Sequence, residues 1–146
     1  MQVHIKTFDE LNTIELYHIL RLRSQVFVVE QDCVYQDIDN KDQLAIHVIG
    51  YHDESIVAYT RIFKPGDYFK QSSIGRVVVD PEFRGKSYGK SIMRASMDYI
   101  HKKSWSTIII SAQCYLDKFY KELGFESTGE EYLEDGIPHQ KMKIIL

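Results

Sequence analysis

A chain of 146 residues fits one ordinary domain and leaves no room for two. Hydrophobic residues make up 44% of it and charged residues 27%, near the averages for globular proteins, which argues against a disordered or fibrous chain. The opening residues lack the layout of a signal peptide, and no apolar run approaches the ~18 residues of a membrane span, so we expect no membrane partner. Two cysteines make neither a disulfide framework nor a zinc cluster, and we expect a reducing, cytoplasmic setting.

The net charge of −3 is unevenly distributed along the chain. Residues 76–103 carry seven basic side chains against three acidic ones, whereas acids gather in 30–42 and 122–135. A basic centre between acidic flanks suits an anionic ligand with a cationic one beside it, although a solvated surface is the commoner reason for such runs. A pI near 6.1 and the lack of a recognisable nucleic-acid-binding module argue against nucleic acid as a partner.

The first half of the chain predicts a strand, a helix, a loop and a hairpin. Val3 and Ile5 alternate with polar residues, as in a half-buried strand. Asn12 and Glu15 have capping-box spacing ahead of apolar residues at helical spacing, so we expect a helix over about residues 13–28. The segments that follow are an acidic loop without periodicity and the two β-rich strands of a hairpin, at 30–43, 45–51 and 56–63.

The second half predicts a strand–helix–strand crossover and a final hairpin. The expected elements are a strand at 74–79, a helix at about 89–103 with Ile92, Met93, Met97 and Ile100 inward, a strand at 107–110 buried on both faces, a short helix at 117–123, and two strands around a turn at 134–136. One crossover within a largely antiparallel pattern predicts a single α/β (α+β) domain over residues 1–146.

The most informative stretch is VVVDPEFRGKSYGKSIM, residues 77–93. A buried strand ends at Asp80, and a loop rich in glycine and lysine then leads into a helix. Glycines let successive backbone N–H groups approach an anion, while the helix dipole, Lys86 and Lys90 add positive charge. The stretch predicts a pyrophosphate-binding loop; the alternative is that its glycines only shape a turn.

Two catalytic motifs nearly match the same stretch. A P-loop would need glycine where Asp80 stands, so we reject that interpretation. The residues GKSYG also fit the G-x-S-x-G pattern of serine hydrolases, with Ser87 as nucleophile and His139 later in the chain. However, Ser87 lies well beyond the end of the strand, and the alternating βα units of that hydrolase fold are missing. A hydrolase that uses Ser87 is therefore a weak alternative.

The same stretch resembles the acyl-CoA-binding motif of the GNAT acetyltransferase superfamily, Arg/Gln-x-x-Gly-x-Gly/Ala after a strand. Arg84, Gly89 and the Val-Asp-Pro lead-in match this motif, and Ser87 stands where the middle glycine is usual. The resemblance extends over nearly the whole chain, where the separated blocks LRLRSQVFVVEQDCVYQDID, AYTRIF, IGRVVV and EDGIPHQKM look like the ElaA-like branch of the family.

A second block, AQCYLDKFYKELGF, resembles the family segment Asn-x-x-Ala-x-x-x-Tyr-x-x-x-Gly-Phe. Tyr120, Gly124 and Phe125 match this segment. Gln113 replaces its usual asparagine and Leu116 its alanine. Tyr120 then stands where the family carries its general acid, which protonates the coenzyme A thiolate as it leaves.

The resemblance implies a mixed, mostly antiparallel sheet whose central parallel strand pair splays, with flanking helices. It also implies that acetyl-CoA is the cosubstrate, that the pantetheine arm pairs with a strand backbone, and that an amine attacks the thioester directly. The residues expected at the cosubstrate are Val77, Val78, Val79, Arg84, Gly85, Lys86, Ser87, Tyr88, Gly89, Lys90, Gln113 and Tyr120.

The acceptor amine must lose a proton before it attacks, because an ammonium has no lone pair. The candidate bases are His139 and Glu30, ranked first, with His47 and Asp135 behind them. The segments 30–42 and 134–139 should border the amine pocket, since carboxylates attract a protonated amine. The chain has no metal-ligand motif, so we expect no metal.

Three functions stay open at the level of sequence. An acetyl-CoA-dependent N-acetyltransferase acting on a small-molecule or peptide amine is favoured. An acyl-CoA-binding module without catalysis and the Ser87 hydrolase are the alternatives. The sequence does not name the amine, and it leaves open whether the chain forms a homodimer.

Overall fold

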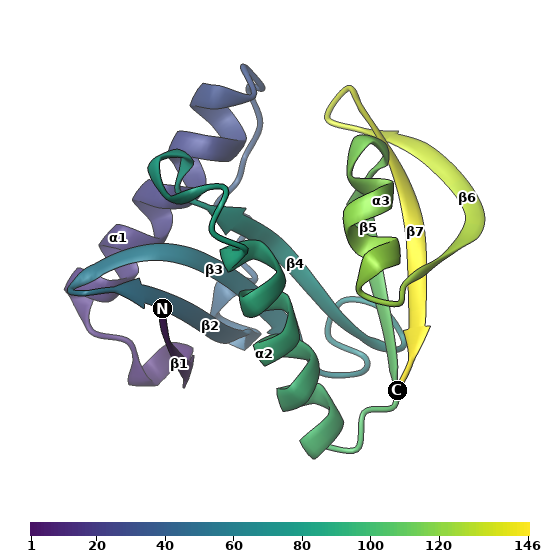
Figure 1. The fold of residues 1–146 in the computed structure, drawn as a ribbon, viewed down its shortest axis with the longest axis horizontal. Coiled ribbons are helices and arrows are strands. Elements are labelled where there is room, and N and C mark those ends of the chain that lie inside the picture. Colours follow the sequence, from purple (N-terminus) through teal and green to yellow (C-terminus); the bar gives the residue numbers. More distant parts are fainter.

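The structure, a computed structural model, describes residues 1–146 and contains one seven-stranded sheet in the order β1-β2-β3-β4-β5-β7-β6 (Figure 1). The strands are β1 (Gln2–Thr7), β2 (Ile46–His52), β3 (Ser55–Phe63), β4 (Ser72–Val79), β5 (Thr107–Gln113), β6 (Glu126–Glu134) and β7 (Ile137–Ile145). Neighbouring strands are antiparallel except β4 and β5, which are parallel and joined through helix α2 (Tyr88–Lys102). The predicted α/β class and its single crossover are confirmed.

The N-terminal helix begins where the sequence predicts. Helix α1 (Thr13–Arg23) has Asn12 as its N-cap. The Asn12 side chain accepts a hydrogen bond from the Glu15 N–H at 2.8 Å, and the Glu15 carboxylate accepts one from the Asn12 N–H at 3.0 Å. At Ser24 the helix widens into a π-helix, Ser24–Glu30, so it ends two residues later than predicted. Such widened turns are frequent at functional sites.

Helices cover both faces of the sheet, and each face has its own apolar cluster (Figure 1). Neighbouring strand residues point to opposite faces: Ala58 packs with Ile92 and Met93 of α2, whereas Tyr59 packs with Ile19 of α1. Burial of a large aliphatic side chain contributes about 1.5–3 kcal/mol, so each cluster binds its helix firmly. Helix α3 (Asp117–Glu122) lies on the α2 side and ends at Gly124, whose φ is +101°. None of the helices is long and apolar enough to cross a membrane.

The parallel strands separate soon after they meet. Pairing between β4 and β5 is confined to Ser72 with Ile108 and Ser73 with Ile109. Strand β4 also contains a bulge, because Arg76 and Val77 together oppose the single residue Thr60 of β3. From Ile74 onward the β5-facing edge of β4 has no strand partner, and this confirms the splay that the sequence resemblance implies.

The final hairpin places the C-terminal strands beside the open end of β5. Strands β6 and β7 are joined by a tight turn in which Asp135 and Gly136 both have positive φ, as a two-residue hairpin requires. Ile108 and Ile110 of β5 face one side of the sheet and Ile109 faces the other, and all three are buried, in agreement with the predicted two-sided burial. Because β7 begins at this turn and runs antiparallel to β5, the turn lies at the same end of the sheet as the splay.

Candidate active site

Two cavities meet at the splay between β4 and β5. The loop cavity, of about 460 Å3, is bordered by the end of β4 and the loop before α2. The strand cavity, of about 330 Å3, lies between β3 and β4 on one side and β5, β7 and the β6–β7 turn on the other. The residues that line both cavities are Phe27, Gln31, Val77, Gln113, Leu116 and Tyr120. Tyr120 therefore stands at the junction of the two cavities.

The loop cavity brings together the residues that the sequence predicts for the cosubstrate, with one exception. Those that line it are Val77, Val78, Val79, Arg84, Gly85, Ser87, Tyr88, Gly89, Lys90, Gln113 and Tyr120. The exception is Lys86, which is exposed on the loop and does not line the cavity. Gly89 lies so close to the cavity floor that a Cβ there would stand 3.3 Å from the Phe119 ring.

The loop before α2 offers unpaired backbone donors to the loop cavity. No backbone N–H from Arg84 through Ser87 donates to an acceptor within the chain. The N–H groups of the first turn of α2 follow directly, and a helix N-terminus leaves these without intrahelical acceptors. Ser87 is in the left-handed region at φ 62°, and Gly85 has φ +83°, which turns the chain into the helix. Free donors at the positive end of a 15-residue helix can bind an anion.

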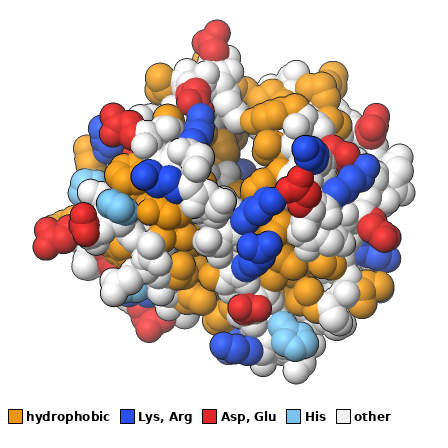
Figure 2. Space-filling view, in the orientation of Figure 1, with side chains coloured by type: hydrophobic (Ala, Val, Ile, Leu, Met, Phe, Trp, Pro, Cys, Tyr) orange, Lys and Arg blue, Asp and Glu red, His pale blue; other side chains and the backbone are white.

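Basic side chains at the loop cavity form exposed ion pairs. Figure 2 shows Lys and Arg side chains beside a hollow on this face of the molecule. Arg84 donates two hydrogen bonds to Glu30, at 2.7 and 2.9 Å, and Lys90 pairs with Glu122. The hydrogen bonds from Arg84 lower the pKa of Glu30. Glu30, one of the predicted bases, thus lies at the loop cavity as a weakly basic, ion-paired carboxylate.

Tyr120 presents a free hydroxyl at the junction of the cavities. Its ring packs edge-on against Phe119 and Phe125, with centroids 5.0 and 6.0 Å away. The hydroxyl makes no hydrogen bond within the chain, and burial raises the pKa of the phenol. At neutral pH the side chain is therefore a neutral hydroxyl that still carries its proton and has a donor to offer.

His139 lies on the β5–β7 wall of the strand cavity. The sheet register aligns Gln113 of β5, His139 of β7 and Tyr132 of β6 in one row. Nδ1 of His139 is 2.7 Å from the carbonyl oxygen of Ile137, and because a carbonyl only accepts, Nδ1 carries the hydrogen. In the neutral ring Nε2 then holds the lone pair, and the nearest carboxylate oxygen, Oε2 of Glu134, is 3.2 Å from it. Nε2 is the ring atom that can take up a proton.

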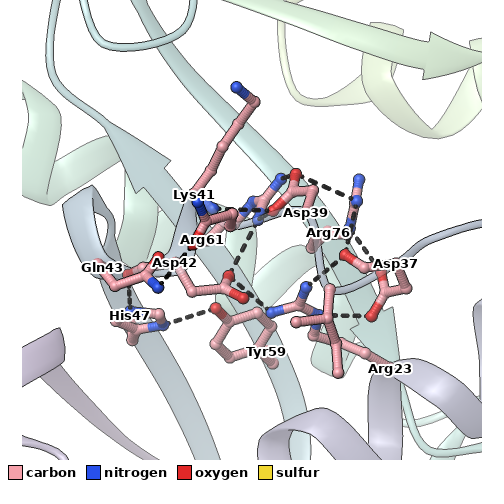
Figure 3. Close-up of polar contacts among 12 residues, drawn as sticks. Arg23, Asp37, Asp39, Lys41, Asp42, Gln43, His47, Tyr59, Arg61 and Arg76 are labelled. Carbon is pink, nitrogen blue, oxygen red and sulfur yellow. Dashed lines mark hydrogen bonds and ion pairs between the residues drawn. The ribbon is translucent and has the colours of Figure 1, made fainter.

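The opposite wall is backed by a closed ring of six alternating charges, which we call the charge ring (Figure 3). Each of its arginines pairs with two of its aspartates, and each aspartate with two arginines. In order around the ring the members are Arg23, Asp37, Arg76, Asp39, Arg61 and Asp42. Arg61 and Arg76 line the strand cavity, whereas none of the aspartates does.

The arginines of the charge ring favour the ionised forms of Asp39 and Asp42. Burial alone would raise the pKa of Asp39, but the hydrogen bonds and charge of Arg61 outweigh it and lower that pKa to about 2. The pKa of Asp42 is lowered against the same burial by Arg23 and Arg61. The six formal charges cancel, so the ring is a neutral, rigid support behind the cavity wall.

Two predicted arrangements are not formed. His47 is fully buried, with Nδ1 2.7 Å from the Tyr59 hydroxyl and Nε2 2.9 Å from the Asp42 carbonyl oxygen, and it lines neither cavity. Burial lowers its pKa, so His47 is a neutral core residue and not a base for the cleft. Ser87 lines the loop cavity while His139 lines the strand cavity, and the polar partners of His139 are Ile137 and Glu134. No serine-hydrolase triad exists around Ser87.

Sequence reasoning missed three residues of the strand cavity. Glu134 belongs to a predicted acidic segment but was not considered beside His139. Arg61 and Arg76 each interrupt an otherwise apolar strand, AYTRIF and IGRVVV. A charged side chain in a buried strand needs a partner, and this was the available signal.

Residues 12–146 match the family model described as the acetyltransferase (GNAT) domain. The chain belongs to the GNAT acetyltransferase family. ElaA of Escherichia coli is 41% identical over 134 residues, which are 90% of this chain and 88% of ElaA. The crystal structure of E. coli ElaA covers 97% of both chains with a TM-score of 0.89 at 37% identity. An acyl-CoA N-acyltransferase from Pseudomonas aeruginosa has a TM-score of 0.91 at 34% identity and covers 98% of this chain and 99% of its own.

The GNAT resemblance drawn from the two motif blocks is thereby confirmed, including its ElaA-like branch. The chain is an N-acetyltransferase domain, and its family supports acyl transfer from acyl-CoA.

Proposed function

We propose that this chain transfers the acetyl group of acetyl-CoA to a primary amine by direct attack on the thioester. The observation that carries the proposal is the junction of the two cavities, where a free tyrosine hydroxyl stands between an anion-binding loop and a wall with a histidine. The loop cavity takes the cosubstrate and the strand cavity takes the amine, which is a small molecule or the end of a peptide.

The cosubstrate is held mainly by backbone. Its pyrophosphate binds at the free N–H groups of residues 84–87 and the start of α2, with Lys90 beside them. Its pantetheine arm lies along Val77–Val79, where the open edge of β4 offers backbone groups to the amides of the arm, as an added strand would. This places the thioester at the junction, within reach of Tyr120.

The chemistry at the junction needs three proton transfers. His139 Nε2 takes a proton from the bound ammonium, and the neutral amine attacks the thioester carbonyl. The tetrahedral adduct collapses, the C–S bond breaks, and the thiolate of coenzyme A takes the proton of Tyr120, while the amine proton of the adduct passes to the Tyr120 oxygen and restores the phenol. The products are an amide and free coenzyme A, and the net proton released goes to solvent.

Replacing Tyr120 with phenylalanine tests the proposal. The Tyr120→Phe variant keeps the ring that packs on Phe119 but deletes the proton, so turnover should fall by ~10²-fold or more, while acetyl-CoA binds nearly as before. Turnover is read as thiol release on a panel of primary amines, and binding is read by calorimetry. Tyr99→Phe is the matched control, because Tyr99 lies on α2 outside both cavities and packs against Trp105.

Two results would count against the proposal. If Tyr120→Phe retained most of its turnover on the best amine, the phenol would not be the proton donor. If the unmodified chain bound acetyl-CoA but released no thiol with any amine, it would be an acyl-CoA-binding module without catalysis.

A further inference from the structure

The strand cavity carries opposite charges on its opposite walls. Arg61 and Arg76 line it from β3 and β4, whereas Glu134 and Asp135 line it from the β6–β7 hairpin. The ring of Tyr68, from the loop between β3 and β4, also lines the cavity and is close enough to both walls for Glu134 and Arg76 to act on its ionisation with opposite sign. A ligand that fills this cavity therefore meets cations on one side and carboxylates on the other.

Arg76 is placed to bind a ligand and not only to complete the charge ring. It stands in the β4 bulge at φ 51°, a backbone conformation that costs a non-glycine residue energy and that clusters at functional sites. Its Nε is 2.7 Å from Asp37 Oδ1, and its Nη2 is 3.1 Å from the Asp37 carbonyl oxygen. One edge of the guanidinium is thus fixed, while Nη1 has no partner within the chain (Figure 3).

The charge ring leaves this positive group available. Asp37 is shared with Arg23, and Asp39 is shared with Arg61, so neither carboxylate belongs to Arg76 alone. The Arg76 side chain is 20% exposed, against 0% and 2% for the other two arginines, and no ring aspartate lines the cavity. The guanidinium is already oriented, so a carboxylate can accept a hydrogen bond from the free Nη1 with little loss of side-chain entropy.

The other wall suits an amine. Glu134 and Asp135 attract an ammonium group, and His139 stands beside Glu134, with Nε2 as the ring atom that can take the proton and 3.2 Å from Glu134 Oε2. Because Gln113 pairs in register with His139 and lines both cavities, this wall continues to the junction where the thioester is placed. The amine end of a ligand would therefore meet the reacting carbon while its other end faces Arg76.

We infer that the acceptor is a zwitterion, a primary amine that carries a carboxylate, with the carboxylate on Arg76 and the amine beside Glu134 and His139. The inference rests on the proposed N-acetyltransferase function and names the class of its acceptor. Acetylation removes the positive charge of the amine and leaves the carboxylate, so the product loses its attraction to Glu134 and departs as an anion.

Matched acceptors test the inference. Linear ω-amino acids of increasing length are compared with the alkylamines of equal carbon number, by thiol release from acetyl-CoA. At the chain length that spans the cavity, kcat/KM for the amino acid should exceed that for its alkylamine by ~10-fold or more, as expected for one charge-assisted contact. Arg76→Gln should bring this ratio near one, whereas Glu134→Gln should slow both members of the pair alike.

Arg76→Lys covers the case in which Arg76→Gln fails to fold, because lysine keeps the charge in the ring but loses the planar fork. It should lower the ratio of kcat/KM for the amino acid to that for its alkylamine. Arg94→Gln is the charge-matched control, since Arg94 is exposed on α2 outside both cavities, and it should leave the ratio unchanged.

The possible failures are distinguishable. If the wild-type chain acetylates alkylamines and prefers no amino acid of any length, the zwitterion inference is wrong and the proposed function stands. If the preference exists but both Arg76 variants keep it, Arg76 is not the anchor and the inference is again wrong. If no amine of either series is acetylated although acetyl-CoA binds, the proposed function itself fails.

Discussion

The two cavities hold their arginines in opposite ways. At the loop cavity, Arg84 pairs with Glu30, and their side chains are 46% and 40% exposed. Behind the strand cavity, Arg23 and Arg61 share Asp42, and the exposed fractions of these side chains are 0%, 2% and 7%. The Arg84–Glu30 pair is open to water, whereas Arg23, Arg61 and Asp42 are buried away from it.

This difference separates an exchangeable charge from a structural one. An exposed ion pair contributes about 0–1 kcal/mol, so Arg84 can leave Glu30 for a phosphate oxygen at little cost. Removing one member of a buried pair costs about 3–5 kcal/mol, because it leaves an uncompensated charge. The loop cavity can therefore rearrange its charges when its ligand binds, while the wall of the strand cavity keeps its shape.

The largest expected effect is the loss of a shared carboxylate from the charge ring. Asp42→Asn should lower the free energy of unfolding by about 3–5 kcal/mol, because Arg23 and Arg61 both lose a buried partner. Urea denaturation measures the change. Asp53→Asn, in the exposed β2–β3 turn, is the control and should stay within about 0.5 kcal/mol of wild type. A loss below about 1 kcal/mol for Asp42→Asn would show that the ring is not structural.

The second prediction concerns the anion-binding loop. Gly89→Asp should weaken acetyl-CoA binding by ~10²-fold, about 2.7 kcal/mol, since its Cβ would stand 3.3 Å from the Phe119 ring and its charge would repel phosphate. Calorimetric titration gives the dissociation constant. Gly129→Asp adds the same charge on β6, outside both cavities, where a Cβ meets nothing within 4 Å; its φ of +86° strains the new side chain locally, but the variant should bind acetyl-CoA normally. An unchanged constant for Gly89→Asp would remove the loop from the cosubstrate site.

The third prediction is that the free energy of unfolding falls in acid because a carboxylate of the charge ring is protonated. The pKa of Asp39 is lowered to about 2, below the ~3.9 of an unfolded chain, so its ionised form stabilises the fold above about pH 4. That contribution should be lost as the pH falls from about 4 to 2, and its size should be smaller than the Asp42 effect, because the Asp39 side chain is 20% exposed. Urea denaturation at stepped pH measures it.

The matching variant is Asp39→Asn, which has no carboxyl group to titrate at this position. Its unfolding free energy should change less between pH 4 and pH 2 than that of the wild type. Equal slopes for the two proteins would mean that Asp39 does not contribute to the acid dependence.

The smallest change in stability is expected at the exposed ion pair between Arg84 and Glu30. Glu30→Gln should change the free energy of unfolding by less than about 0.5 kcal/mol and tighten acetyl-CoA binding by a few-fold, since Arg84 no longer has a competing carboxylate. Calorimetric titration and urea denaturation report the two quantities. Weaker binding would mean that Glu30 orients Arg84 toward the cosubstrate and does not compete with it.

Local patterns predicted most of the elements. The Asn12–Glu15 capping box, the hairpin around residues 53 and 54, and the strand–helix–strand crossover all follow from contacts between near neighbours in the chain. The basic glycine loop was found for the same reason, because a helix start and its glycines are adjacent in sequence. The π-helix at Ser24–Glu30 was missed, since its apolar residues still repeat at nearly helical spacing.

The candidate bases show what local sequence patterns do not predict. The sequence ranks His139 and Glu30 as the first candidate bases, with His47 behind them. In the structure His47 is buried in the core, Glu30 is ion-paired at the loop cavity and His139 lines the strand cavity. A side chain's solvent contact and hydrogen-bond partners decide whether it can move a proton, and neither is encoded by residue type.

The sequence by itself determined the element order, the GNAT resemblance and the position of the glycine-rich loop before α2, because each follows from residue spacing within short segments. Only the tertiary structure decided which charges face the cavities. The partners in the charge ring lie between 14 and 39 residues apart along the chain, and the His139–Glu134 contact depends on a hairpin that also places both side chains beside β5. Periodicity reports which face of an element is apolar, whereas the pairing of buried charges depends on how separate elements pack, and that is settled by the whole fold.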